Sequence, residues 1–119
     1  QAGVDVIYDC VGGDHAEAAV RASAWNGRFL IVGFASGDIP KLPLNLLLLK
    51  GCGALGVFWG RSVDKDPQGY RHNMSQLMQW VAEGKLNPRI GTTLQMDKAA
   101  EGIRMLDNRT ATGKIVLIP

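Results

Sequence analysis

Apolar positions along this chain of 119 residues gather in short runs that alternate with helical stripes. Three runs, at residues 4–10, 28–34 and 53–59, are rich in β-branched and aromatic side chains and have no polar face. Such runs predict strands that are covered on both sides, as in a parallel sheet. Weak alternation at residues 89–96 and a final apolar run at 112–119 predict two further strands.

Helices are predicted between these strands. The first is rich in alanine and runs to Trp25, and Asn26 and Gly27 are expected to end it. Asp14 and Glu17 have the spacing of a capping box at its start.

A short helix is predicted at residues 44–50, and the polar stretch at 60–69 is typical of an exposed loop. The clearest helix follows, with one apolar face made by Tyr70, Met74, Leu77, Met78 and Val81. Asp97 is expected to cap the last helix. The shared apolar face of that helix is Ala100, Ile103 and Leu106.

Strands and helices therefore alternate as β-α-β-α-β-α-β-α-β, without an internal repeat. That order predicts the α/β class with a largely parallel sheet.

Apolar residues make up 46% of the chain and charged residues 20%, which is ordinary globular composition. The net charge of +2 comes from scattered basic residues, and the longest apolar run is far below the roughly 20 residues of a membrane span. We expect a cytoplasmic protein that binds neither nucleic acid nor membranes.

Few residues suit acid–base or metal chemistry. His15 and His72 are the only histidines, and no CxxC, HxxxH or HExxH spacing occurs, so neither a metal site nor a catalytic residue is predicted. Cys10 and Cys52 are predicted to be buried free thiols in a reducing compartment.

The stretch GCGALG at residues 51–56 matches G-x-G-x-x-G. A dinucleotide turn requires a strand before the motif, a helix starting at its last glycine and an acid about 20 residues later. Here a helix is expected before the motif and none in the segment after it, and Gln76 and Leu77 occupy the region of the acid. The motif is therefore interpreted as a helix end that leads into a strand.

Four segments in order carry a family resemblance: GVDVIYDCVGG, GRFLIVGFASGDIPKLPLNLLLLKG, GVFWG and TGKIVLIP. The chain resembles the C-terminal part of a medium-chain dehydrogenase/reductase, in the zinc-free quinone oxidoreductase-like branch. The resemblance implies the second half of a Rossmann-type parallel sheet with flanking helices at residues 1–85. Residues 86–119 would return to a GroES-like catalytic domain.

The same resemblance places a cofactor against residues at the carboxyl ends of three strands. The implied residues are Val11, Gly12, Gly13, Gly33, Phe34, Ala35, Ser36, Val57, Phe58 and Trp59. A Cβ at Gly33 would keep the backbone away from the cofactor. The alternative is that the glycines are turn residues and that Phe58 and Trp59 belong to the core. Asp9 also ends a strand, but it follows the wrong strand for a ribose-binding acid.

By resemblance, the whole protein transfers hydride from NADPH or NADH to a quinone or an α,β-unsaturated carbonyl, without a metal. The chain of 119 residues lacks the family's phosphate-binding turn, so we expect it to be inactive alone. A homodimer through the strand at residues 53–59 is also implied. The alternative is a free-standing α/β interaction or oligomerisation module without catalysis, because a bare strand edge recruits partners.

Overall fold

The computed structural model describes residues 3–119, which form two compact units, the first ending at Pro67 and the second starting at Gln68. These units are defined by how compactly their own residues pack. The boundary predicted after residue 85 instead separates the two domains that the family resemblance implies. The assignment of residues 1–85 and 86–119 stays a prediction, and residues 1 and 2 lie outside the described part of the chain.

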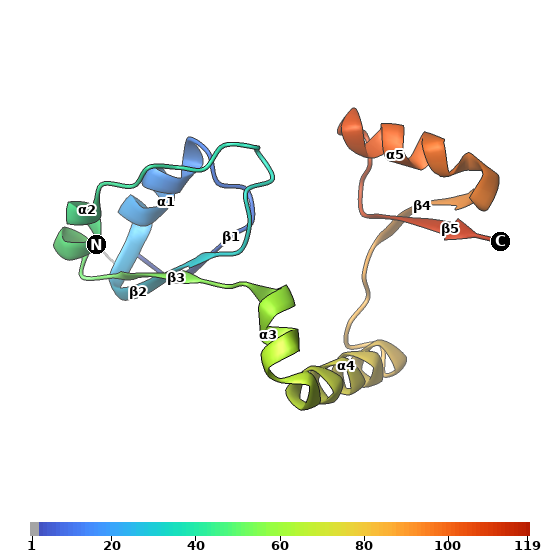
Figure 1. Ribbon diagram of the computed structural model, residues 1–119, viewed down its shortest axis with the longest axis horizontal. Coiled ribbons are helices and arrows are strands. Elements are labelled where there is room, and N and C mark those ends of the chain that lie inside the picture. The colour runs from blue at the N-terminus through green and yellow to red at the C-terminus, as the bar shows by residue number, and fades with distance from the viewer. Residues whose placement is uncertain (1–2) are drawn as a thin grey trace. The chain divides into compact units, whose positions relative to one another are not determined.

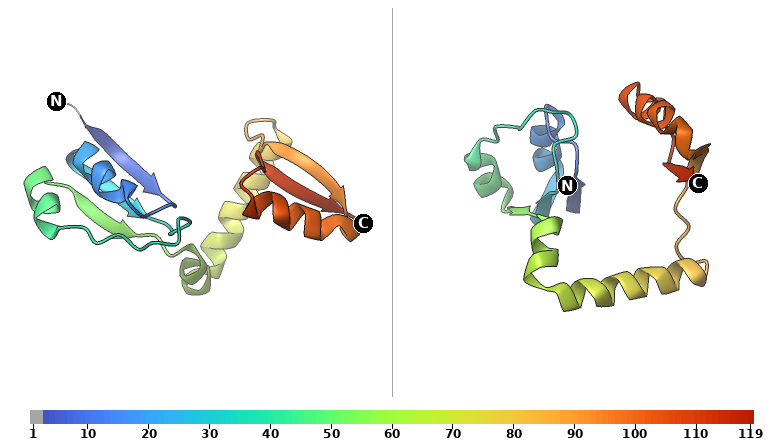
Figure 2. Two further views of the ribbon diagram at one scale, coloured as in Figure 1. Left: turned by 90° about the horizontal axis from the view of Figure 1, so that it is seen from above. Right: turned by 45° about the vertical axis from the view of Figure 1, so that its right-hand side comes forward.

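The first unit contains a three-stranded parallel sheet in the order β1-β2-β3. Its elements are β1 (Val4–Asp9), α1 (His15–Ala22), β2 (Ser23–Ile31), α2 (Leu44–Lys50), β3 (Gly53–Gly56) and α3 (Trp59–Lys65) (Figure 1). The three arrowheads point the same way in Figure 2, left. Parallel strands require crossover connections, and here α1 and α2 provide them.

The core of this unit lies on one face of the sheet. Ile7, Phe29 and Ala54 are register partners across the three strands and therefore share a face. They pack with residues from the two crossover helices: Ala16, Val20 and Leu46. Phe29 is only 1% exposed. The covering helices thus pack on one face of the sheet, around the buried Phe29.

The opposite face of the sheet is open within this unit, which corrects the prediction of strands covered on both sides. Val4, Val6 and Tyr8 alternate along β1, and all three are exposed. Tyr8 is in register with Leu30 and Leu55, and Leu55 is also exposed. No element of the first unit contributes core residues on this face.

The first helix ends three residues before the predicted position. α1 stops at Ala22, and Ser23 is already extended, fully buried and paired with Val4. Asn26 has φ of 61°, a left-handed conformation that Asn tolerates, so it marks an irregularity within β2 rather than a helix end.

The predicted capping box at the start of α1 does not form. Asp14 has helical backbone angles and makes no side-chain cap hydrogen bond. Glu17 instead pairs with Arg21 one turn later, with Oε1 and Nη2 2.7 Å apart.

The polar stretch at residues 60–69 is helical, so the predicted loop is wrong. α3 covers most of it without a buried residue, and α4 (Pro67–Ala82) begins at a proline, which suits the first helical position. An exposed helix has no apolar stripe by which its sequence could be distinguished from that of a loop.

The interpretation of GCGALG is confirmed, because Gly51 is the left-handed C-cap of α2 and β3 starts at Gly53. The expectation that no helix starts just after the motif is wrong, since α3 begins at Trp59.

The second unit combines α4 with a β-α-β motif. β4 (Ile90–Gln95) and β5 (Lys114–Ile118) pair in parallel, and η1 (Met96–Lys98) and α5 (Ala99–Asp107) connect them (Figure 2, left). Glu83, after α4, accepts hydrogen bonds from Lys85 and Gln79, which lower the pKa of its exposed carboxyl.

The packed side of α5 differs from the prediction. Gly102 is buried against Ile115 and Leu94, whereas Ile103 and Leu106 of the predicted apolar face are exposed. The helix also begins after a 3₁₀ turn, so Lys98 rather than Asp97 is the N-cap. The small Gly102 allows the helix to approach the two strands closely.

The core row generates a stability prediction. Phe29→Ala should lower the free energy of unfolding by about 3–5 kcal/mol, because it leaves a cavity between the sheet and both helices. Ile39→Ala serves as the control, because Ile39 is 73% exposed, and should change stability by no more than about 0.5 kcal/mol. Urea unfolding followed by circular dichroism measures both values. Equal losses for the two variants would contradict the described core.

Candidate functional site

The carboxyl ends of the three parallel strands meet at one edge of the sheet. Asp9 is in register with Ile31 at the end of β2, and Ile31 is in register with Gly56 at the end of β3. The segments that follow, 11–13, 33–36 and 57–59, therefore leave the sheet side by side. We call these three segments the strand-end rim. They contain all ten residues of the predicted cofactor site, and their role in binding stays a prediction.

Backbone hydrogen bonds join the first two segments of the rim. Ala35 N donates to Cys10 O at 3.1 Å, and Ser36 N donates to Val11 O at 3.0 Å. Gly13 N donates to Asp38 O at 3.1 Å, beyond the second segment. The two loops therefore extend the pairing of β1 with β2 past the ends of both strands.

Asp9 contributes both its backbone and its side chain to this arrangement. Its carboxylate Oδ1 accepts hydrogen bonds from Val11 N at 2.9 Å and Gly12 N at 3.0 Å. Its backbone oxygen accepts a hydrogen bond from Val32 N at 2.8 Å. The carboxylate of Asp9 thus holds the turn after β1.

The three glycines of the rim differ in whether the fold could accept a side chain at their positions. Gly12 has φ of 68°, and a Cβ there would lie 2.7 Å from Phe34 Cδ1. Gly13 has φ of 65°, and a Cβ there would lie 2.9 Å from Ser36 Oγ. Gly33 has no positive φ, and the nearest atom to an added Cβ, Cys10 O, is an ordinary 3.5 Å away. Only the first two glycines are required by the local fold.

A hollow of about 280 Å³ lies between the ends of β2 and β3. Its lining is mostly apolar and consists of Ile31, Val32, Gly33, Phe34, Gly56, Val57 and Phe58. The strand predicted to continue through Trp59 ends at Gly56, and Phe58 and Trp59 are both exposed. This exposure contradicts the alternative that the two aromatics are core residues.

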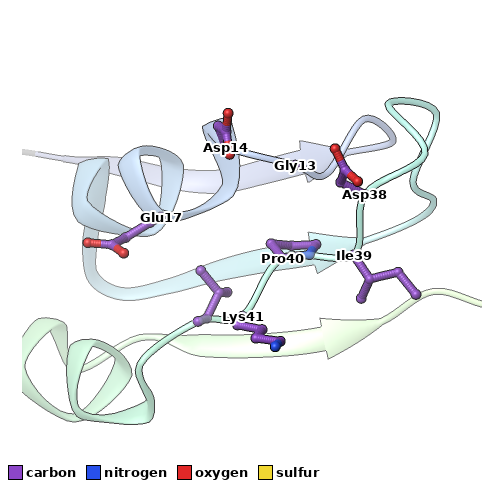
Figure 3. A pocket seen from close by; sticks show the side chains of 8 residues that line it. Gly13, Asp14, Glu17, Asp38, Ile39, Pro40 and Lys41 are labelled. Carbon is purple, nitrogen blue, oxygen red and sulfur yellow. The ribbon is translucent and has the colours of Figure 1, made fainter.

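A second hollow, of about 360 Å³, lies between the start of α1 and the loop before α2 (Figure 3). Asp14 and Glu17 project from the helix, and Asp38 and Lys41 come from the loop (Figure 3). Three carboxylates against one ammonium disfavour a phosphate, because like charges repel.

Only some of the predicted cofactor-binding residues line the two hollows. Gly33, Phe34, Val57 and Phe58 line the apolar hollow, while Gly13 lines the acidic one. The remaining predicted residues, Val11, Gly12, Ala35, Ser36 and Trp59, lie on the rim outside the two linings. The linings also contain residues that the sequence did not single out: Ile31, Val32, Gly56, Asp38 and Lys41. Strand-end position could have indicated the first three, whereas the others depend on how a loop returns over α1.

The cysteines are placed differently from the prediction. Cys10 is exposed at the end of β1 and Cys52 is half-buried, and both are free thiols. Across residues 3–119, no group of three or more His, Cys, Asp or Glu side chains is arranged to hold a metal ion. None of the helices in that range is long and apolar enough to cross a membrane.

Known sequences resemble the chain along nearly its whole length. A model of the zinc-binding dehydrogenase family matches residues 1–117. The chain is 40% identical over 116 residues to the quinone oxidoreductase-like protein 2 homolog of Nematostella vectensis, which covers 97% of this chain and 32% of that protein. It is 37% identical over 115 residues to quinone oxidoreductase-like protein 2 of Bos taurus, covering 97% and 33%. The chain thus spans about a third of the length of the curated relatives it matches.

Solved structures share the fold. Mycobacterial Rv1454c complexed with NADPH superposes with a TM-score of 0.85 at 21% identity, covering 99% of this chain and 36% of that one. A quinone oxidoreductase of Pseudomonas syringae pv. Tomato gives a TM-score of 0.81 at 27% identity, covering 98% and 36%. The likeness to the first structure is one of fold alone. Together the two confirm the predicted fold class.

The contrast between the rim glycines is testable by stability. Gly12→Ala should cost about 1–3 kcal/mol, because alanine at a positive φ is strained and its Cβ meets the Phe34 ring. Gly33→Ala, the matched control, should leave stability unchanged or raise it by about 0.4–1 kcal/mol. Chemical unfolding of the two variants measures the difference. A loss at Gly33 as large as that at Gly12 would show that the fold also requires a glycine at residue 33.

Proposed function

The chain belongs to the quinone oxidoreductase-like branch of the medium-chain dehydrogenase/reductase superfamily, and we propose that it supplies half of the cofactor crevice of an NAD(P)H-dependent oxidoreductase. The reaction of the whole protein is hydride transfer to a quinone or an α,β-unsaturated carbonyl. The observation that carries the proposal is the strand-end rim, where three parallel strands end in register beside an apolar hollow.

Topology supports the position of the cofactor. The strands β1, β2 and β3 follow one another across the sheet in a single direction. A doubly wound sheet consists of two such halves, and its ligand lies beyond the carboxyl ends of the strands where the two halves meet. In this chain that point is the outer edge of β1, next to Val11, Gly12 and Gly13. The cofactor would extend from there across Gly33 toward β3.

The residues of the rim have distinct roles in this proposal. Gly33 allows the nicotinamide nucleotide to approach the backbone closely, since the space beside it is not filled by the chain. The hollow between β2 and β3 offers an apolar slot that excludes water from the reacting ring. Its volume is just below the range of about 300–1,000 Å³ for ligand pockets, which suits one end of a dinucleotide rather than the whole. The bound nicotinamide supplies the hydride, and the chain supplies orientation.

We propose that the 119 residues alone are catalytically silent. They contain no G-x-G-x-x-G turn between a strand and a helix, because GCGALG spans the end of α2 and β3. The backbone amides that usually bind the pyrophosphate are therefore missing from the crevice. No metal enters the proposed chemistry.

Oligomerisation is the second candidate function, and it rests on the two open sheet edges. β1 and β3 each pair only with β2 among the described strands. The outer edge of β3 therefore carries backbone N–H and C=O groups to which a second strand could pair. Beside this strand, α2 exposes Leu44, Leu48 and Leu49. A homodimer through residues 53–59 would cover this edge.

NADPH titration followed by fluorescence tests the cofactor proposal. The 119-residue chain should show no micromolar binding and no quinone turnover, whereas the protein as expressed from its gene should bind NADPH or NADH and reduce a quinone. Gly33→Ala in the expressed protein should weaken cofactor binding about tenfold, because the added methyl group occupies the space left for the nucleotide.

Ile39→Ala is the control for this titration, because Ile39 lies outside the rim and the apolar hollow. Micromolar binding by the 119 residues would show that the other half of the crevice is unnecessary. Unchanged binding in Gly33→Ala would remove Gly33 from the site.

The dimer is testable by light scattering at high micromolar concentration. Val57 N donates inward to Ile31 O, so the N–H groups of Ala54 and Gly56 point away from β2. Ala54→Pro should therefore give a monomer, because it removes an outward donor without removing a bond to β2. Ala54→Ser keeps the donor and should remain dimeric. A monomeric unsubstituted protein would contradict the proposed dimer.

A further inference from the structure

We infer that Asp9 is the positioning residue of the strand-end rim, fixing both loops that receive the cofactor. The inference rests on the proposed function for the identity of the ligand, but its structural part stands on the hydrogen bonds of Asp9 alone. Asp9 itself is outside the predicted binding set and acts through Val11, Gly12 and Val32.

The side chain of Asp9 fixes the first loop. One carboxylate oxygen, Oδ1, accepts from the amides of Val11 and Gly12 at 2.9 and 3.0 Å. Two consecutive left-handed residues, Gly12 and Gly13, follow directly. Glycine loses more backbone entropy on ordering than any other residue, so this turn needs an external constraint to hold one conformation. The two hydrogen bonds to Asp9 Oδ1 provide that constraint.

The backbone of Asp9 fixes the second loop. Its carbonyl oxygen accepts from Val32 N at 2.8 Å and, at a longer 3.4 Å, from Gly33 N. The loops then remain joined, because Ser36 N donates to Val11 O at 3.0 Å. Displacing the turn at Val11 would therefore also displace the segment that lines the apolar hollow. Asp9 thus contacts both loops and acts together with the backbone hydrogen bonds that join them.

Oxygen geometry, rather than charge, should decide which substitutions are tolerated. Asn at residue 9 keeps an oxygen in the same place and can accept both amide hydrogen bonds. Glu keeps the charge but moves the carboxylate outward by one methylene group. Ala removes the acceptor. We therefore expect Asp9→Asn to resemble the unsubstituted protein, and Asp9→Glu and Asp9→Ala to lose the constraint.

Two measurements on the protein as expressed from its gene test the inference. In hydrogen–deuterium exchange, a peptide covering residues 10–14 should exchange about tenfold faster in Asp9→Ala and Asp9→Glu, and within about threefold of the unsubstituted rate in Asp9→Asn. In quinone reduction, KM for NADPH should rise about tenfold in the same two variants with kcat changed less than threefold. Asp5→Ala is the matched control on the same strand and should change neither quantity.

The outcomes separate the inference from the proposed function. Unchanged exchange in both Asp9→Ala and Asp9→Glu would overturn the positioning role, whatever the cofactor does. Faster exchange with an unchanged KM for NADPH would overturn the link between the rim and the cofactor. An unsubstituted protein that binds neither NADPH nor NADH would overturn the proposed function, while the exchange rates would still decide the structural role of Asp9. If Asp9→Ala fails to fold, the comparison of Asp9→Glu with Asp9→Asn tests the same hydrogen bonds without truncating the side chain.

Discussion

The parallel register of β1, β2 and β3 is the constraint on which the rest of the first unit depends. It places Ile7, Phe29 and Ala54 in one row, and this row is what α1 and α2 bury. The same register ends the three strands in step at Asp9, Ile31 and Gly56. Because a parallel sheet sends every carboxyl end to the same edge, the pairing that makes the core also makes the rim.

The rim shows how structural glycines differ from a glycine that leaves room for a ligand. Gly12 and Gly13 have backbone angles and neighbours that exclude a side chain, so the fold accounts for them fully. Gly33 has neither restriction. The space beside Gly33 serves no packing within the chain, which is why the proposed cofactor contact centres on it. The loops around it are fixed by backbone bonds and by the carboxylate of Asp9.

Apolar periodicity predicted the elements whose burial follows a simple pattern. β1, α2, α4, β4 and β5 occur where the runs and stripes indicated. It failed where long-range contacts decide the conformation. Ser23 joins β2 because Val4 pairs with it, and no local signal reveals that partner. Gly102 faces the sheet because its small size lets α5 approach Ile115, although Ile103 and Leu106 make the more apolar stripe. A polar helix such as α3 has no stripe to detect.

The sequence by itself determined the α/β class and the family, because these follow from short-range patterns and motifs. Only the tertiary structure decided which glycines the fold requires, which hollow is apolar and which acidic, and which face of the sheet is open. These properties depend on distances between segments far apart in the chain, such as Gly12 to Phe34. The role of Asp9 belongs to the second group. A strand-terminal acid is visible in the sequence, but the amides that it accepts from are fixed only by the turn after β1.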